Sequence, residues 1–169
     1  MELQRAERRA LHADLNELRE HKSLVPWRHR PTLLLIEDDT EMRRMLAAAL
    51  RRDGHVVVEA ANGDDALDWL GPGVLDGDVE RVPDLIVSDI RLPYFTGLEI
   101  LESLQVAARR IPVILITGFP DRETYAQATE LGAECVLEKP FDLGELRAAV
   151  HLALRARGQR SPGPDDASR

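Results

Sequence analysis

Carboxylates, a hydroxyl and an ammonium group follow short apolar runs in this sequence. They are Glu37, Asp38 and Asp39 after residues 33–36, Asp89 after 85–88 and Thr117 after 112–116, while Lys139 comes one residue after the run 135–137. Short apolar runs are typical of buried parallel strands. In open parallel α/β sheets, ligands bind at the carboxyl ends of the strands. We therefore expect these side chains to share one site.

Grouped carboxylates repel one another, and either protonation or a bound cation relieves the repulsion. A site of oxygen ligands with few protein donors suits Mg²⁺, which keeps several waters and also binds phosphate oxygens. Such an ion would neutralise a phosphoryl group while an Asp attacks it in line, which gives an acyl phosphate. Lys139 and Thr117 could then hold the phosphoryl oxygens, and Gly118 leaves room beside them.

Each of these residues also has a purely structural explanation. Glu37, Asp38 and Asp39 could cap a following helix, and Asp89 could simply turn the chain after its strand. Thr117 could be a hydroxyl at a strand end, and Lys139 could be a surface residue. What favours a site is that all of them fall at strand ends in one topology.

Apolar strands and amphipathic helices alternate five times along the chain. We expect the first helix to carry an apolar stripe and to begin at Asp39 or Thr40. The second begins at Asn62 and ends near Gly71, and a long loop spans Gly71–Val82. The remaining helices are expected from Gly97 to about 108, from Asp121 to 130, and from 142 to about 157. The stripe of the first helix is formed by Met42, Met45, Leu46, Ala49 and Leu50.

This alternation predicts an α/β fold with a doubly wound parallel sheet. Five units in about 125 residues suit the flavodoxin-like order 2-1-3-4-5, a five-stranded sheet. Residues 1–30 are expected to form an extra N-terminal helix and linker, 31–157 the main domain, and 158–169 a disordered tail.

Composition limits the partners and the compartment. The net charge of −8 argues against a nucleic-acid-binding surface, and no apolar run is long enough for a membrane span. Cys135 is the single cysteine, which fits a reducing compartment, so we expect a cytoplasmic protein. The apolar stripe in residues 1–30 could pair two copies of the chain as a homodimer.

The chain resembles the receiver domain of two-component response regulators over residues 31–157. Four motifs carry the resemblance: Leu-Leu-Ile-Glu-Asp-Asp, Leu-Ile-Val-Ser-Asp-Ile-Arg-Leu-Pro, Ile-Leu-Ile-Thr-Gly, and Gly-Ala followed after three residues by Leu-Glu-Lys-Pro-Phe. The resemblance implies that Asp89 accepts phosphate from the phosphohistidine of a sensor histidine kinase or phosphotransfer protein. It implies Mg²⁺ held by Asp89, Asp38 and the Arg91 backbone carbonyl, with Glu37 acting through water.

In the same way, the resemblance implies that Thr117 and Lys139 bind the phosphoryl group and that the Lys139–Pro140 bond is cis. One departure concerns Val136, because the family usually has Tyr or Phe three residues before this lysine. Valine lacks the ring that moves inward in the family, so the usual relay to the last helix is in question.

No segment after Arg157 is long enough for an effector domain. We therefore expect a stand-alone regulator with output through a protein partner, which catalyses only its own phosphorylation and dephosphorylation. Two alternatives remain: a degenerate receiver that binds a partner without phosphate, and a Mg²⁺-dependent aspartyl-phosphate phosphohydrolase. A haloacid-dehalogenase-type phosphatase would usually have an acidic residue where this chain has Arg91, which argues against the last alternative.

Overall fold

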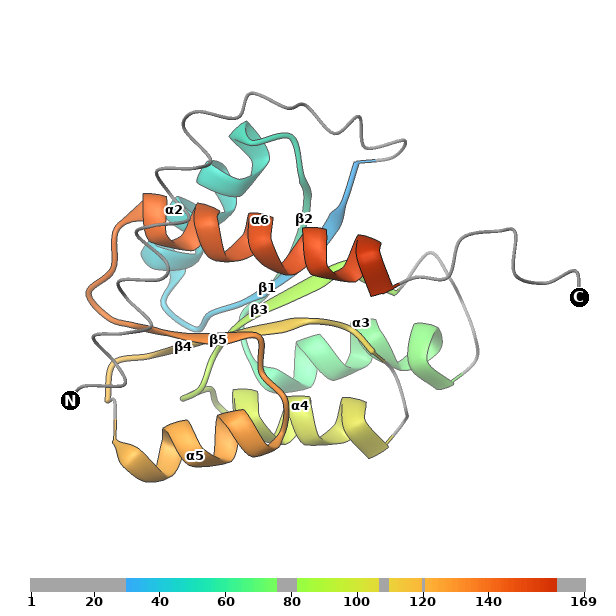
Figure 1. The fold of residues 1–169 in the computed structure, drawn as a ribbon, viewed down its shortest axis with the longest axis vertical. Coiled ribbons are helices and arrows are strands. Elements are labelled where there is room, and N and C mark those ends of the chain that lie inside the picture. Colours follow the sequence, from blue (N-terminus) through green and yellow to red (C-terminus); the bar gives the residue numbers. More distant parts are fainter. Residues whose placement is uncertain (1–29, 76–81, 107–109, 120, 161–169) are drawn as a thin grey trace, which may run out of the picture.

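The structure of the protein is a computed structural model that describes residues 30–75, 82–106, 110–119 and 121–160 (Figure 1). Five strands are present, β1 (Thr32–Ile36), β2 (Val56–Ala60), β3 (Leu85–Asp89), β4 (Val113–Thr117) and β5 (Cys135–Glu138). The helices between and after them are α2 (Thr40–Arg52), α3 (Gly63–Leu75), α4 (Gly97–Val106), α5 (Arg122–Glu130) and α6 (Leu143–Arg160). The expected N-terminal helix within residues 1–30 lies outside the described residues.

The five strands form one parallel sheet in the order β2-β1-β3-β4-β5, which confirms the predicted fold class. Helices α2 and α6 cover one face of the sheet, and α3, α4 and α5 cover the other (Figure 1). Because all strands run in one direction, their carboxyl ends lie along one edge, and the loops to the next helices start there.

Two apolar layers hold the sheet between the helices. Every residue of β3 and β4 is buried, as expected for central strands that are covered on both faces. Alternate residues of β1 enter opposite layers: Leu33 and Leu35 face α2 and α6, whereas Leu34 and Ile36 face α3 and α4. The central strands are thus packed on both faces, and their packing positions the residues at their ends.

Short polar sequences cap the helices. The Asp39 carboxylate accepts the Met42 amide at 2.7 Å and caps α2, as the sequence predicts. Asp142 and Glu145 bond to each other's backbone amides at the start of α6, which is the expected capping box. At the start of α3, the Asn62 side chain accepts the Asp65 amide at 2.8 Å.

Three details of the helices differ from the sequence prediction. Helix α3 continues through Pro72 to Leu75, so the loop expected from Gly71 is wrong at its start. A proline disfavours helix locally, but Leu70 and Gly73 are buried and this tertiary packing outweighs the local preference. Helix α6 likewise extends to Arg160. Residues 76–81 lie outside the described part of the chain.

The third difference concerns Met45, which was expected in the buried stripe of α2. Its side chain is 48% exposed, and the buried residues of that helix are Leu46, Ala47, Ala49 and Leu50. Met45 precedes Leu46 by one residue and so lies about 100° around the helix from it, beyond the arc that the sheet covers. Within the described residues, no helix has the length and apolar character needed to cross a bilayer.

Candidate functional site

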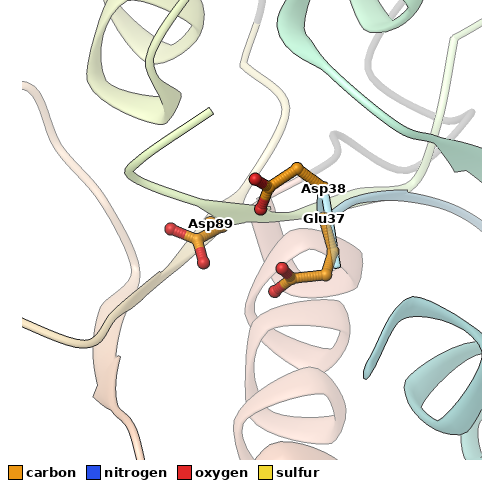
Figure 2. A group of neighbouring side chains, drawn as sticks. All are labelled: Glu37, Asp38 and Asp89. Atoms are coloured by element: carbon orange, nitrogen blue, oxygen red, sulfur yellow. The ribbon is translucent and has the colours of Figure 1, made fainter. Parts of the chain in front are cut away.

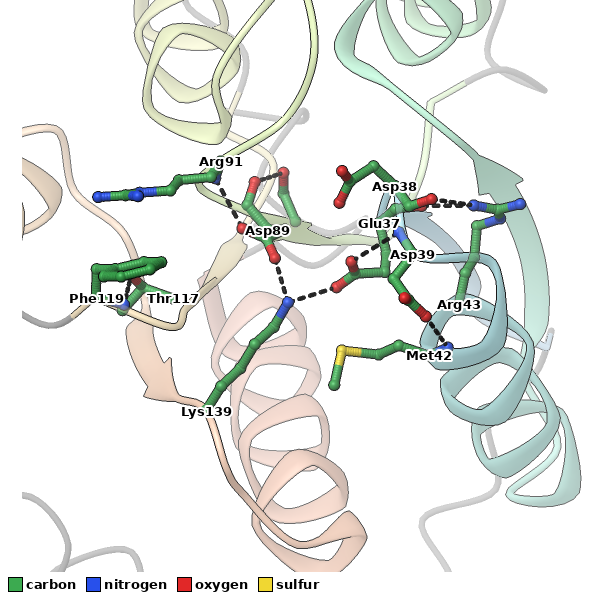
Figure 3. A network of polar contacts seen from close by, with 11 residues as sticks. Glu37, Asp38, Asp39, Met42, Arg43, Asp89, Arg91, Thr117, Phe119 and Lys139 are labelled. Carbon is green, nitrogen blue, oxygen red and sulfur yellow. Dashed lines mark hydrogen bonds and ion pairs between the residues drawn. The ribbon is translucent and has the colours of Figure 1, made fainter.

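The predicted site residues meet at the carboxyl edge of the sheet (Figure 3). Glu37 and Asp38 directly follow β1, Asp89 ends β3, Thr117 ends β4, and Lys139 follows β5. Asp89 pairs in register with Ile116, so Thr117 lies one residue further along the neighbouring strand. The strand order therefore brings residues from four separate parts of the chain to one place.

Three carboxylates form the centre of the site. One oxygen atom from each of Glu37, Asp38 and Asp89 lies within 4.8 Å of the others (Figure 2). Glu37 is 1% exposed and Asp89 is 5% exposed, whereas Asp38 is open to solvent. Buried carboxylates at this spacing need compensating positive charge, and such oxygen donors are those that Mg²⁺ prefers.

Lys139 supplies positive charge from the far side of the site. Its ammonium Nζ lies 3.0 Å from Glu37 Oε2 and also forms an ion pair with Asp89 Oδ2 (Figure 3). Its backbone amide donates to the Thr117 carbonyl oxygen at 2.7 Å, which fixes the end of β5 against the end of β4. The Lys139–Pro140 peptide is cis, as the resemblance implies.

Burial and charge shift the protonation of two groups here. Burial raises the pKa of Glu37 above its ordinary value, although hydrogen bonds from Lys139 and the Asp39 amide act in the opposite direction. Burial also opposes the charge on Lys139, but hydrogen bonds to Asp89 and Glu37 outweigh it and the pKa of Lys139 is raised. Lys139 is therefore a fixed cation at neutral pH.

Backbone amides hold the second carboxylate oxygens of Asp89 and Glu37, and an arginine holds the Glu37 carbonyl oxygen. The Arg91 amide donates to Asp89 Oδ1 at 2.7 Å, and the Asp39 amide donates to Glu37 Oε1 at 3.1 Å. The guanidinium of Arg43, on α2, donates to the Glu37 carbonyl at 2.7 Å and so braces the loop between β1 and α2. Sequence reasoning missed Arg43, since an arginine on the polar face of a helix gives no distinguishing signal.

Thr117 and Gly118 begin the loop after β4. Thr117 is 2% exposed, and its hydroxyl oxygen accepts the Phe119 amide at 3.0 Å. The Phe119 ring lies under the Arg91 guanidinium, 3.7 Å from its central carbon (Figure 3). A Cβ built at Gly118 would lie 3.9 Å from Lys139 Cδ, an ordinary contact. The neighbouring side chains by themselves therefore do not require a glycine at this position.

Gly97 is a supporting residue that the sequence analysis treated only as the start of a helix. A Cβ at Gly97 would lie 2.5 Å from the Asp89 carbonyl oxygen and 2.9 Å from Ser88 Oγ. Its amide also donates to the Ile90 carbonyl at 3.0 Å. Only a residue without a side chain lets α4 begin this close to Asp89.

Comparison with known proteins agrees with this geometry. The sequence pattern of the response regulator receiver domain matches residues 33–151. Sporulation initiation phosphotransferase F of Bacillus subtilis is 32% identical over 118 residues, which cover 70% of this chain and 89% of that protein. Transcriptional regulatory protein AfsQ1 of Streptomyces coelicolor is 38% identical over 130 residues, 77% of this chain and 53% of that protein.

Solved structures show the same fold. The CheY-like response regulator receiver domain protein of Methanospirillum hungatei superposes with a TM-score of 0.70 at 22% identity, covering 79% of this chain and 100% of that one. The chain spans about half the length of several curated relatives that it matches. The family match over 119 residues and the relatives above 30% identity decide the family. The chain therefore belongs to the receiver domains of two-component response regulators, which signal by phosphorylation.

Proposed function

We propose that Asp89 accepts a phosphoryl group from the phosphohistidine of a sensor histidine kinase or a phosphotransfer protein. One observation carries the proposal. The buried Asp89 carboxylate contacts the Lys139 ammonium. One of its oxygens also lies within 4.8 Å of a carboxylate oxygen of Glu37 and one of Asp38. A nucleophile, a cation and a set of oxygen ligands thus lie together at the edge where α/β sheets bind ligands.

The proposed step exchanges one bond for another. An oxygen of Asp89 forms a bond to phosphorus while the bond from phosphorus to the donor imidazole nitrogen breaks, and that nitrogen keeps the electron pair. The product is an acyl phosphate on Asp89. Lys139 compensates the charge on the phosphoryl oxygens. The Thr117 oxygen already accepts the Phe119 amide, so its hydroxyl hydrogen is the part that would bind a phosphoryl oxygen.

The donor set fits Mg²⁺. We propose that Asp38, Asp89 and the Arg91 carbonyl hold the ion directly, and that Glu37 acts through water. The Glu37 oxygens are held by Lys139 and by the Asp39 amide. When bound, Mg²⁺ would supply positive charge that neutralises the phosphoryl oxygens. Lys139 and the Arg91 amide meanwhile hold the two oxygens of Asp89 in fixed directions.

The output is proposed to be contact with another protein. The loops that follow β3 and β4 expose large apolar side chains beside the site, Tyr94 at 80%, Phe95 at 40% and Phe119 at 58%. Large exposed apolar side chains on the loops at the site's edge of the sheet favour a binding surface there. We also propose that the domain catalyses only chemistry at its own Asp89. Pairing of two copies through residues 1–30 stays a prediction, since residues 1–29 lie outside the described part.

The proposal is tested by intact-protein mass spectrometry after incubation with acetyl phosphate, with and without Mg²⁺. We expect wild type to gain one phosphoryl group only when Mg²⁺ is present, and Asp89→Asn to gain none. Asp65→Asn is the matched control, because Asp65 is an exposed partner of Asn62 at the start of α3 and the substitution removes the same charge. This control should gain the phosphoryl group as wild type does.

Other outcomes would favour the alternatives. If folded wild type gains no phosphoryl group from acetyl phosphate or from a histidine kinase, the degenerate receiver becomes the better explanation. Sustained release of phosphate from unrelated phosphomonoesters, lost in Asp89→Asn, would instead favour the phosphohydrolase.

A further inference from the structure

A hydrogen bond joins helix α5 to the end of β5, next to the site. The Tyr125 hydroxyl donates to Glu138 Oε1 at 2.5 Å. Both side chains are half-buried, and Glu138 directly precedes Lys139. This bond directly links a side chain of α5 to the strand residue that adjoins the phosphoryl-binding lysine.

The strand geometry explains why Glu138 can reach α5. Val136 packs with the apolar layer that lies under α3, α4 and α5, while Leu137 packs with the opposite layer under α2 and α6. Side chains alternate along a strand, so Glu138 lies on the same face as Val136. Val136 offers this face a small apolar side chain, and the hydroxyl that meets Glu138 comes from Tyr125 on the helix.

Further contacts connect the two ends of this bond to Thr117 and Lys139 in the site. Thr117 and Glu138 are register partners in neighbouring strands, and the Lys139 amide donates to the Thr117 carbonyl at 2.7 Å. Helix α5 begins a few residues after Thr117, capped by Asp121. A displacement of Thr117 or Lys139 therefore reaches α5 by two routes: along the loop after β4, and through Glu138 to Tyr125.

We propose that the Tyr125–Glu138 hydrogen bond couples the phosphorylation state of Asp89 to helix α5. This inference rests on the proposed function. A phosphoryl group on Asp89 replaces the direct contact between Asp89 and Lys139, and it recruits the Thr117 hydroxyl. The end of β5 and the start of α5 then shift relative to each other, and the bond transmits that shift to the helix. Tyr125 acts through Glu138 and is a positioning residue.

The test is hydrogen–deuterium exchange of peptides covering residues 122–130, before and after phosphorylation with acetyl phosphate and Mg²⁺. Intact mass measured on the same samples gives the phosphorylated fraction. In wild type, phosphorylation should change exchange across α5. In Tyr125→Phe, which removes only the hydroxyl, the phosphorylated fraction should be unchanged, while the change in α5 exchange should fall by about half or more.

Thr129→Ala is the matched control on the same helix. Thr129 is exposed, and its hydroxyl donates to the Tyr125 carbonyl within α5 at 2.8 Å. The Thr129→Ala variant therefore loses a hydroxyl that makes no contact with β5, and its α5 should respond to phosphorylation as in wild type. At the other end of the bond, Glu138→Gln keeps an acceptor oxygen and should retain most of the response, whereas Glu138→Ala should lose it.

Two results would overturn the inference. One is an equal phosphorylation response of α5 in wild type and Tyr125→Phe, and the other is no response of α5 in phosphorylated wild type. Both leave the proposed function intact, because the mass gain is measured separately. Absence of any mass gain in wild type would overturn the proposed function and the coupling together.

Discussion

The Lys139 ammonium reaches the Asp89 carboxylate although their strands are not neighbours. Strand β4 lies between β3 and β5, and the residues are 50 positions apart in the chain. The ion pair thus spans a central strand at the edge of the sheet, and the same ammonium also bonds to Glu37 at 3.0 Å. One cation therefore balances two buried carboxylates, and its loss would leave both without this compensation.

Lys139→Met should slow phosphorylation by acetyl phosphate about 10²-fold or more, because it removes a preorganised charge at the phosphoryl oxygens. The measurement is the rate of mass gain at saturating Mg²⁺. Arg147→Met is the control, since it removes a cation from a surface ion pair with Asp53 at 2.8 Å and should leave the rate unchanged. A wild-type rate in Lys139→Met would exclude Lys139 from the chemistry.

Asp38→Asn should raise the Mg²⁺ concentration needed for half-maximal phosphorylation by about tenfold or more, since even indirect supports of a metal site contribute that much. Asp39→Asn is a close control. Asp39 caps α2 through the Met42 amide, and Asn caps helices as well as Asp does. Equal Mg²⁺ requirements in the two variants would mean that Asp38 is not a ligand.

Gly63→Ala should destabilise the fold by about 1–3 kcal/mol, as overpacking does. A Cβ at this position would lie 2.4 Å from the Phe95 carbonyl oxygen and 2.6 Å from Phe95 Cβ, so the loop after β3 would have to move. Gly158→Ala in α6 meets no atom within 4 Å. It should be neutral or stabilising by up to about 1 kcal/mol. Urea unfolding measures both, and equal free energies of unfolding would contradict the prediction.

Stability should fall as the pH is lowered from about 7.5 to about 5.5, with a contribution from two histidines. Burial lowers the pKa of His55, with Asp53 opposing this and His151 adding to it; burial and Arg155 lower the pKa of His151. Below the ordinary histidine pKa, the unfolded state therefore binds more protons than the folded state. The free energy of unfolding then rises with pH through this range.

The test of this contribution is the urea midpoint of His55→Gln at both pH values. Within the described residues, Nδ1 of His55 is a buried polar atom without a hydrogen-bond partner, so protonation there has no acceptor to bind. The substitution should flatten the pH dependence relative to wild type. If the difference between the two midpoints is the same in both proteins, the histidine does not contribute.

The sequence by itself determined the alternation of strands and helices and the residues that end each strand. Short apolar runs such as Leu85–Ser88 predict buried strands from their length and composition alone. The caps at Asp39 and Asp142 are also predictable, because the first amides of every helix need hydrogen-bond acceptors. The polar residue after each run could therefore be placed at the sheet edge from the order of residues alone.

Local signals were less informative where packing competes with propensity. Pro72 predicts a helix end, yet α3 continues past it, with Leu70 and Gly73 buried on either side of the proline. Met45 fits an apolar stripe, yet it lies outside the arc that the sheet covers. In both cases, the deciding free energy comes from contacts with distant residues, which a local pattern does not contain.

Only the tertiary structure decided which strand ends become neighbours and which side chains meet across them. The contact of Lys139 with both Asp89 and Glu37 depends on strand order, and the Tyr125–Glu138 bond depends on the face of β5 that α5 covers. Neither is encoded in the spacing of residues along the chain, because each arises from the way separate elements pack against one another. The sequence identified the polar residues at the strand ends, and the packing of the sheet brought their side chains into contact.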